Sequence, residues 1–447
     1  MIDLFVLNPL SVRIFLMADK KKLDTSPYKG VRDFYPEDMY VLNYITSVMR
    51  KTAESFGYSE YGASPIEPAE LYKAKSGEEI VSEQTYTFTD RGGREVTLRP
   101  EMTPTVARMV TAKKRELSFP LRWYSISNMF RYENPQKGRL REHYQLNMDI
   151  FGVSGLDAEA EIIETAWQMM KNFGAKDDDF QIRINSRLIL DDIFSSIGIK
   201  DSEKTVLLKI IDKKDKISSD VFADSIKKII GNRSNELLNL FEVNQRILDH
   251  LGTDNPNVKN LIGLIERLDS FGIKNIQYTP SLVRGFDYYT DIVFEIFDTS
   301  PENKRSLFGG GRYDDIFNLF GGDVIPAVGY GMGDVTIRDF LTEHGLMPEY
   351  KSNTDLFICQ VSPVSTQEIS FLASRLRASG INVAIDLSKR KIGDQIKNAD
   401  KMMIPFIVCV GEEEIKNKIY KIKNLKSGKE NALEEKEISN FIKTSGV

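Results

Sequence analysis

Residues 129–152 read MFRYENPQKGRLREHYQLNMDIFG, two strand-like runs separated by a polar loop. Polar and charged side chains recur at every second position of both runs, so each run turns them to one face of a strand. The loop NPQKGR adds a lysine and an arginine, which suit phosphate groups. The segment predicts an antiparallel pair of strands with a ligand-facing side, although a solvated polar face would give the same pattern. The alternating residues are Arg131, Glu133, Gln145, Asn147 and Asp149.

Three other segments place polar residues inside strand-like or turn-like runs. TLRPEMTPTVARMV (97–110) reads as a strand that turns into a helix, LVRGFDYYTDIVFE (282–295) as a strand entering a turn, and FGGGRYDDIF (308–317) as a glycine-rich strand. Charge that is buried costs free energy unless it is paired or used, so these segments together predict a pocket. Their polar residues include Arg99, Glu101, Thr103, Arg284, Asp287, Tyr288, Tyr289, Glu295 and Arg312.

Composition describes a globular protein without a dominant charge. The 447 residues exceed one ordinary core, and 41% are hydrophobic and 28% charged. The net charge of −5 excludes a basic field over the whole surface. Two cysteines and three histidines are too few for a disulfide framework or a histidine metal cluster, which favours a reducing compartment such as the cytoplasm. The apolar start, residues 1–16, is shorter than a membrane span, so no membrane association is expected.

The pattern along the chain divides it into parts. Short strand-like runs with glycine and proline punctuation fill residues 25–186 and 277–345, which predicts an antiparallel sheet. Amphipathic helical patterns occupy residues 187–276 and indicate an insertion into that domain. Residues 354–447 alternate strand and helix, as in an α/β domain. Residues 1–24 are expected to be an N-terminal arm, either disordered or the product of a mis-assigned start.

Taken in order, the motifs TLRPEMT, FRYENPQKGRLREHYQ and LVRGFDYYT resemble those of class II aminoacyl-tRNA synthetases. The third resembles the segment peculiar to histidyl-tRNA synthetases, and the likeness extends from about Tyr28 to the C-terminus. It implies an α+β catalytic domain with a six-stranded antiparallel sheet and flanking helices, an inserted helical domain, and a C-terminal α/β anticodon-binding domain. GYSEYGASPIEP (57–68) resembles the weak dimer-interface motif, which implies a homodimer.

The resemblance also implies a reaction and its residues. L-histidine would react with ATP to give histidyl-adenylate, with Mg²⁺ held mainly by phosphates and water rather than by protein ligands, and the histidyl group would pass to the 3′ end of tRNA-His. Arg284 and Arg131 would be catalytic, and Gln136 would approach the tRNA acceptor end. The implied histidine-binding residues are Glu101, Thr103, Arg131, Gln145, Asp149, Arg284, Tyr288 and Tyr289. The implied ATP-binding residues are Arg131, Glu133, Arg139, Arg141 and Arg312.

One motif departs from the family pattern. The third motif usually ends in Gly-Leu-Glu-Arg, whose arginine holds the ATP γ-phosphate, but here the run is Gly-Asp-Val-Thr and Thr336 stands at the arginine position. Either Arg338 or Arg312 compensates, or the chain binds ATP differently.

Other functions fit the residues less well. A regulatory paralogue that serves ATP phosphoribosyltransferase in histidine biosynthesis is the main alternative, but such proteins lack the anticodon domain and tend to lose the LVRG-YY segment. A synthetase for proline, threonine or glycine would not carry residues 282–295. A binding protein with merely solvated polar strands would not repeat these motifs in order.

Overall fold

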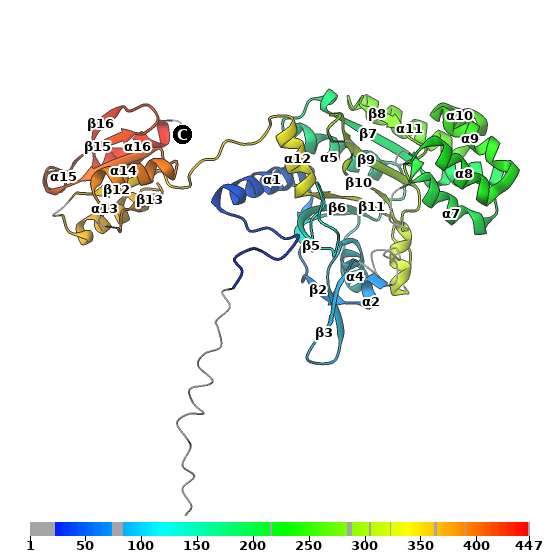
Figure 1. Cartoon of the computed structure of the whole chain (residues 1–447), viewed down its shortest axis with the longest axis horizontal. Helices are drawn as coiled ribbons and strands as arrows, with labels where there is room; N and C mark the ends of the chain where they lie inside the picture. The colour runs from blue at the N-terminus through cyan, green and yellow to red at the C-terminus, as the bar shows by residue number, and fades with distance from the viewer. Residues whose placement is uncertain are drawn as a thin grey trace, which may run out of the picture. The chain divides into compact units, whose positions relative to one another are not determined.

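The computed structural model describes residues 23–73, 84–214, 217–283, 288–303, 305–321, 323–361, 364–388 and 390–445. The chain forms two compact units that meet in sequence between Met347 and Pro348 (Figure 1). No helix in the described ranges is long and apolar enough to cross a membrane.

A sheet of eight strands organises the first unit, in the order β1-β5-β6-β11-β10-β9-β7-β8. The six strands from β5 to β7 in this order all pair antiparallel, which confirms the predicted catalytic sheet. The sequence patterns did not predict that the edge strands β1 and β8 pair in parallel with their neighbours. The strands are β1 (Ser59–Glu60), β5 (Leu121–Phe130), β6 (Glu142–Phe151), β7 (Phe180–Ser186), β8 (Ile276–Tyr278), β9 (Ile292–Asp298), β10 (Ser306–Arg312) and β11 (Ala327–Gly333).

Helices cover one face of this sheet and leave the other to polar residues. On β6, Leu146, Met148 and Ile150 point into the main core, whereas the residues between them point to the opposite face. The covering helices pack on the central strands and on each other. Helix α1 begins with a proline at its first turn, and its buried positions recur every three or four residues. The helices of this layer are α1 (Pro36–Ser55), α5 (Asp157–Asn172) and α12 (Asp334–Glu343).

Smaller elements complete the polar side of the sheet. Helix α4 (Thr103–Lys113) packs against the 3₁₀ segment η5 (Asp314–Phe320) and closes a second apolar cluster there. Strands β2 (Ile66–Pro68), β4 (Glu95–Leu98) and β3 (Tyr86–Thr89) form a separate antiparallel sheet, next to helix α2 (Glu70–Lys73). The β3–β4 hairpin projects from the unit (Figure 1).

A helical block lies between β7 and β8. Its helix α11 packs on β7 and α5, and its buried leucine and isoleucine side chains join the main core. The helices are α6 (Arg187–Ser196), α7 (Asp201–Ile211), α8 (Ser219–Ile230), α9 (Ser234–Glu242), α10 (Asn244–Leu251) and α11 (Pro256–Ser270), with the 3₁₀ turns η2 (Asp177–Asp179) before β7 and η4 (Gly231–Arg233) after α8.

The second unit is an α/β domain with its own core, as predicted from its alternating pattern. Its five-stranded sheet has the order β13-β12-β14-β15-β16. The first three strands of this order are parallel and the last two pairings are antiparallel. The elements are β12 (Leu356–Gln360), α13 (Thr366–Ala378), β13 (Val383–Ile385), α14 (Ile392–Lys401), β14 (Phe406–Val410), α15 (Glu412–Asn417), β15 (Ile419–Asn424), β16 (Glu430–Glu434) and α16 (Glu435–Thr444).

A buried ion pair fastens the helical layer to the sheet. Arg312, the last residue of β10, donates from Nε and Nη2 to both carboxylate oxygens of Glu159 on α5, and the Nη2–Oε2 distance is 2.7 Å. Its Nη1 also donates to the Val153 carbonyl at 3.1 Å. The side chains of Arg312 and Glu159 are 6% and 2% exposed, so neither charge is hydrated by bulk water.

We expect Arg312→Ala to destabilise the first unit by about 3–5 kcal/mol, because it leaves the Glu159 carboxylate buried without its partner. Urea unfolding can be followed by tryptophan fluorescence, since both tryptophans, Trp123 and Trp167, belong to this unit. The control Arg94→Ala removes a bridge to Asp90 from a side chain that is 80% exposed, and should change stability by less than about 0.5 kcal/mol. An equally small change for both variants would contradict the argument.

Candidate active site

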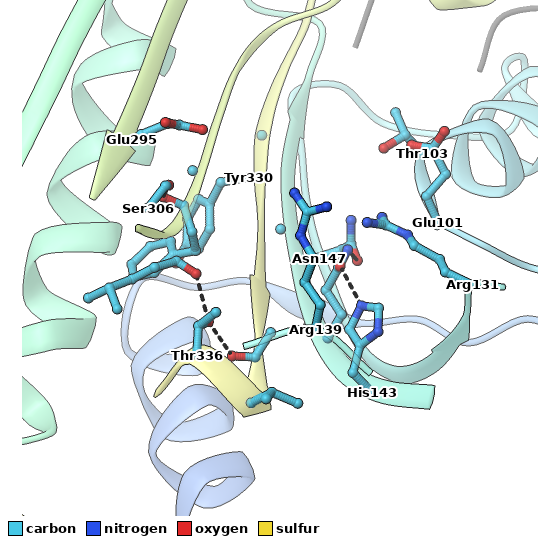
Figure 2. A pocket seen from close by; sticks show the side chains of 18 of the residues that line it. Glu101, Thr103, Arg131, Arg139, His143, Asn147, Glu295, Ser306, Tyr330 and Thr336 are labelled. Atoms are coloured by element: carbon cyan, nitrogen blue, oxygen red, sulfur yellow. Dashed lines mark hydrogen bonds between the residues drawn. The ribbon is translucent and has the colours of Figure 1, made fainter. Parts of the chain in front are cut away.

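The polar face of the sheet forms the floor of a cavity of about 290 Å³. Figure 2 shows Glu101, Thr103 and Arg131 on one side of it and Glu295 and Ser306 on the other. The walls come from β6, β9, β10 and β11, from the start of α4 and from the first turn of α12. Segments that are far apart in the sequence therefore meet at one place, as the four polar motifs predicted.

Two glycines of β11 make room for the polar side chains of β6. Gly329 pairs with Asp149 and Gly331 with Asn147 across the two strands. A Cβ atom added to Gly329 would lie 2.2 Å from Asp149 Oδ1, and one added to Gly331 would lie 2.7 Å from Gln145 Nε2. Side chains at these positions would fill the floor of the cavity, so the glycines keep it open.

Asp149 is a buried carboxylate with an unused acceptor. The Tyr313 hydroxyl donates to its Oδ1, while Oδ2 has no hydrogen-bond partner among the described residues. Burial raises the pKa of Asp149 to about 7, and the hydrogen bond from Tyr313 opposes this only in part. A buried acceptor that lacks a partner inside the protein is suited to a donor supplied by a ligand.

Glu101 and Tyr288 form a second polar pair at the same end of the cavity. The Tyr288 hydroxyl lies 3.0 Å from Glu101 Oε2 and 3.4 Å from Thr103 Oγ1. Burial, followed by the nearby Glu101 charge, holds the pKa of Tyr288 well above its usual value, so the phenol keeps its proton and donates. The Tyr289 ring lies beside that of Tyr288, with 5.0 Å between ring centroids. This end can bind ligand groups that donate hydrogen bonds.

Arg99, which precedes Pro100 and Glu101, has a structural role. It is buried and donates from Nε to the Asn128 carbonyl at 2.9 Å and from Nη1 to the Ala63 carbonyl at 2.8 Å. These bonds fix the turn that leads into α4, and with it the position of Glu101. Arg99 does not line the cavity and therefore positions the site without touching a ligand.

The other end of the cavity is cationic. Arg131 donates from Nε to the Pro100 carbonyl at 2.9 Å, which holds its guanidinium in place. Arg139 Nη1 lies 3.7 Å from Glu133 Oε2, and both side chains line the cavity. His143 Nε2 lies 3.4 Å from Gln145 Oε1. Burial, reinforced by the Arg131 charge, lowers the pKa of His143 to about 3, so the ring is neutral at physiological pH. This end suits a polyphosphate and a flat, uncharged base.

Most of the predicted site residues therefore meet, but not all. The cavity is lined by Glu101, Thr103, Arg131, Glu133, Arg139, Gln145, Asp149, Tyr288 and Tyr289. Arg284 and Asp287 lie outside the described residues. Gln136 lies on the hairpin loop above the cavity and is not part of its wall.

Two residues that were predicted to bind ATP, Arg312 and Arg141, do not line the cavity. Arg312 faces α5 in its ion pair with Glu159, because its side chain points away from the polar face. Arg141 donates from Nη1 to the Tyr28 hydroxyl at 3.0 Å and stacks over the Tyr132 ring at 4.0 Å. It joins the N-terminal segment to the hairpin and is absent from the cavity wall.

The third motif carries Thr336 in place of the family arginine, and the structure shows what this residue contacts. Thr336 lines the cavity, and its hydroxyl donates to the Leu307 carbonyl at 2.7 Å (Figure 2). Arg338 instead binds Asp38 with an Nη2–Oδ1 distance of 2.7 Å. Neither Arg338 nor Arg312 lines the cavity, so neither replaces the family arginine there.

Several wall residues were not assigned from the sequence. Asn147 lies between the assigned Gln145 and Asp149 at the same period, so the alternation already pointed to it. Glu295 was singled out as polar but received no role. His143 lies two residues before Gln145 on β6 and continues the same alternation. Ser306, Tyr313 and Tyr330 carried no signal, because only the fold brings them to the cavity.

Known proteins agree with this architecture. The model of the family described as histidyl-tRNA synthetase matches residues 30–334, and that of the anticodon binding domain matches residues 355–445. A histidine–tRNA ligase of Leptospira biflexa is 44% identical over 414 residues, which cover 91% of this chain and 95% of the relative. A histidine–tRNA ligase of Thermoplasma volcanium is 38% identical over 409 residues, which cover 90% and 94%.

A solved structure shares the fold. The crystal structure of histidyl-tRNA synthetase from Nostoc sp. PCC 7120 has a TM-score of 0.80 at 22% identity, and the match covers 95% of this chain and 100% of that chain. The family match spans the catalytic motifs, and the relatives align over nine-tenths of the sequence. On these findings the chain belongs to the histidyl-tRNA synthetase family.

Proposed function

We propose that this chain is a histidine–tRNA ligase, which activates L-histidine with ATP and transfers it to the 3′ end of tRNA-His. One observation carries the proposal: a single cavity has buried acceptors at one end and two guanidinium groups, those of Arg131 and Arg139, at the other. The acceptor end fits a cationic amino acid with a nitrogen-rich side chain. The guanidinium end fits the phosphates of a nucleotide, so the two substrates would meet inside one site.

The acceptor end would select histidine. Asp149 Oδ2 would accept from a ligand N–H, either the ammonium or the imidazole. Glu101 and Thr103 would hold the ammonium, and Tyr288 and Tyr289 would face the ring. Gln145 would add an amide next to these groups. A site that leaves buried acceptors unpaired when the ligand lacks donors rejects apolar amino acids strongly.

The cationic end would hold ATP. Arg131 would contact the α-phosphate and the histidine carboxylate, and Glu133 would accept from the adenine amino group. Arg139 would neutralise phosphate charge, and the neutral ring of His143 would lie against the base. Arg284, which the family motif assigns to the α-phosphate, would stabilise the charge that develops there.

The reaction would proceed in two transfers. A histidine carboxylate oxygen attacks the α-phosphorus, a P–O bond forms, and the bond to the bridging oxygen of pyrophosphate breaks. The terminal ribose hydroxyl of the tRNA then attacks the carbonyl carbon and releases AMP. The protein needs no covalent intermediate, because orientation and charge stabilisation lower the barrier.

Magnesium would enter with ATP. The described residues contain no cluster of three metal-ligating side chains, so the ion would be held mainly by phosphates and water, together with a wall carboxylate such as Glu295. When bound it neutralises phosphate charge.

The partners follow from the other parts of the chain. The unit that matches the anticodon binding domain would bind tRNA-His, and we place the reaction in the cytoplasm. Residues 57–68, which include β1 and β2, resemble a dimer motif, and Ile66 in this segment is 46% exposed. This supports a homodimer.

The anticodon-domain match also favours a synthetase over a regulatory subunit, because a regulatory subunit has no anticodon to read.

The amino-acid specificity can be measured by ATP–pyrophosphate exchange with each of the twenty amino acids. We expect exchange with histidine only, because histidine combines an ammonium group with a small flat ring that can donate N–H groups to the buried acceptors and face the two tyrosines. No exchange with any amino acid would exclude adenylation. In that case binding to an ATP phosphoribosyltransferase would test the regulatory alternative.

We expect Arg284→Ala to lower histidine-dependent exchange by at least about a hundredfold, the usual loss when one group that stabilises transition-state charge is removed. Histidine binding measured by calorimetry without ATP should change little. An equal loss in both measurements would show that Arg284 acts in binding or folding.

Asp149→Asn should stabilise the protein and impair it. The folded pKa of Asp149, about 7, exceeds its usual 3.8, so the carboxyl lowers stability increasingly as the pH rises from about 4 to about 7. The variant should therefore be more stable than the wild type by up to about 4 kcal/mol at pH 8 and by much less at pH 5. Histidine-dependent exchange should fall at least about tenfold. A stability difference that does not vary with pH would contradict the burial argument.

A further inference from the structure

A hairpin loop, residues 133–139, covers the nucleotide end of the cavity. Gln136 N–H donates to the Arg139 carbonyl at 3.0 Å, and Arg139 N–H donates to the Gln136 carbonyl at 2.9 Å. Lys137 and Gly138 form the turn, and Gly138 has a φ of +74°, which explains the glycine. Glu133 and Arg139 of this loop reach the cavity wall. Arg131 and Arg139 are the arginines among the described residues that line the cavity. Arg139 lies on this loop, so the position of the loop sets the position of Arg139.

Arg305 ties this loop to the sheet. It directly precedes β10, and its guanidinium donates from Nη1 to the Lys137 carbonyl at 3.0 Å and from Nη2 to Gln136 Oε1 at 3.1 Å. One planar group thus binds the backbone and a side chain of the turn at once. The Arg305 side chain is exposed and outside the cavity wall, so it acts on the loop rather than on the core.

The Gly138 side of the turn faces the first turns of α12, where Thr336 replaces the arginine of the third family motif. A Cβ atom on Gly138 would lie 3.8 Å from Thr336 Cγ2 and 3.9 Å from Asp339 Oδ2. The family arginine would extend from this place on α12, next to the loop. Here the Thr336 hydroxyl is bound to the Leu307 carbonyl, and α12 meets the turn through a methyl group and a carboxylate. The positive charge that binds phosphate must then come largely from the side of the cavity that the hairpin loop forms.

We propose that Arg305 is a positioning residue that latches the hairpin loop over the ATP phosphates and sets the place of Arg139. The inference rests on the proposed function. Arg131 is already fixed by the Pro100 carbonyl, whereas the side chain of Arg139 is 59% exposed and its one ion pair with a described residue is the 3.7 Å contact with Glu133. Holding the loop before ATP arrives removes an ordering cost from binding, so the latch strengthens ATP affinity more than it changes the chemical step.

The first test is histidine-dependent ATP–pyrophosphate exchange by Arg305→Ala. We expect the KM for ATP to rise about tenfold with a smaller change in kcat, unchanged KM for histidine, and an unchanged Tm. Arg305→Lys, which keeps the charge and can restore one of the two bonds, should lie between the wild type and Arg305→Ala. A fall in Tm, or equal effects on both substrates, would overturn the proposal.

A matched control is Arg246→Ala. Arg246 is also exposed and also donates to a backbone carbonyl and a side-chain amide oxygen, those of Asn239 at 3.1 Å and 2.8 Å, but in the helical block. Its removal should leave both KM values unchanged.

A double-mutant cycle separates a latch from a direct phosphate contact. If Arg305 acts through Arg139, Arg305→Ala should add little to the KM for ATP of an Arg139→Ala variant. Independent, multiplying effects would instead assign Arg305 a contact with ATP and overturn the latch.

Trypsin gives a readout that does not depend on activity. Release of the loop should speed cleavage after Lys137 and Arg139 in Arg305→Ala, and not in Arg246→Ala. If the wild type shows no exchange, the proposed function fails while the cleavage rates still test the latch. Normal exchange by the wild type with unchanged KM values and cleavage in Arg305→Ala would overturn the latch alone.

Discussion

The two-residue alternation of strand side chains is the constraint on which this structure depends. On β6, one set of residues, Leu146, Met148 and Ile150, is buried under helices, and the intervening set forms a polar floor. A shift of the strand by one residue would put the Asp149 carboxylate and the two amides into the core and leucine into the cavity. The apolar core therefore fixes the register, and the register fixes the order in which Gln145, Asn147 and Asp149 face a ligand.

Charges of the first unit divide into structural and functional groups. Arg312 with Glu159, and Arg99 with backbone carbonyls, are satisfied within the protein and hold elements together. Asp149 retains an acceptor without a partner in the described structure, although burial raises its pKa to about 7. This arrangement lowers stability, and it makes sense if a substrate supplies the missing donor. The contrast distinguishes a binding residue from a buried structural one more clearly than burial alone.

The cationic end of the cavity lacks the arginine that ends the third motif in the family pattern. Thr336 cannot reach phosphate with a charge, and the nearby arginines of α12 and β10 are engaged elsewhere. The cations that line the described cavity lie on β5's end and on the hairpin loop. A loop cation needs an anchor to be effective, because a mobile side chain loses entropy on binding. Arg305 provides a bidentate anchor at a position that no motif marks.

The sequence alone determined the antiparallel central sheet, the alternating C-terminal domain and nine of the residues that line the cavity, because these depend on local periodicity and on short motifs. Residues such as Glu101, Arg131 and Asp149 could be found in this way. Tertiary structure alone decided that Arg312 and Arg141 point away from the cavity, that Tyr313 enters it, and that Arg305 reaches the hairpin. These facts depend on which face a strand turns to its neighbours and on contacts between residues as far as 169 positions apart. Periodicity within a segment carries no information about such contacts, because they arise only when the segments pack together.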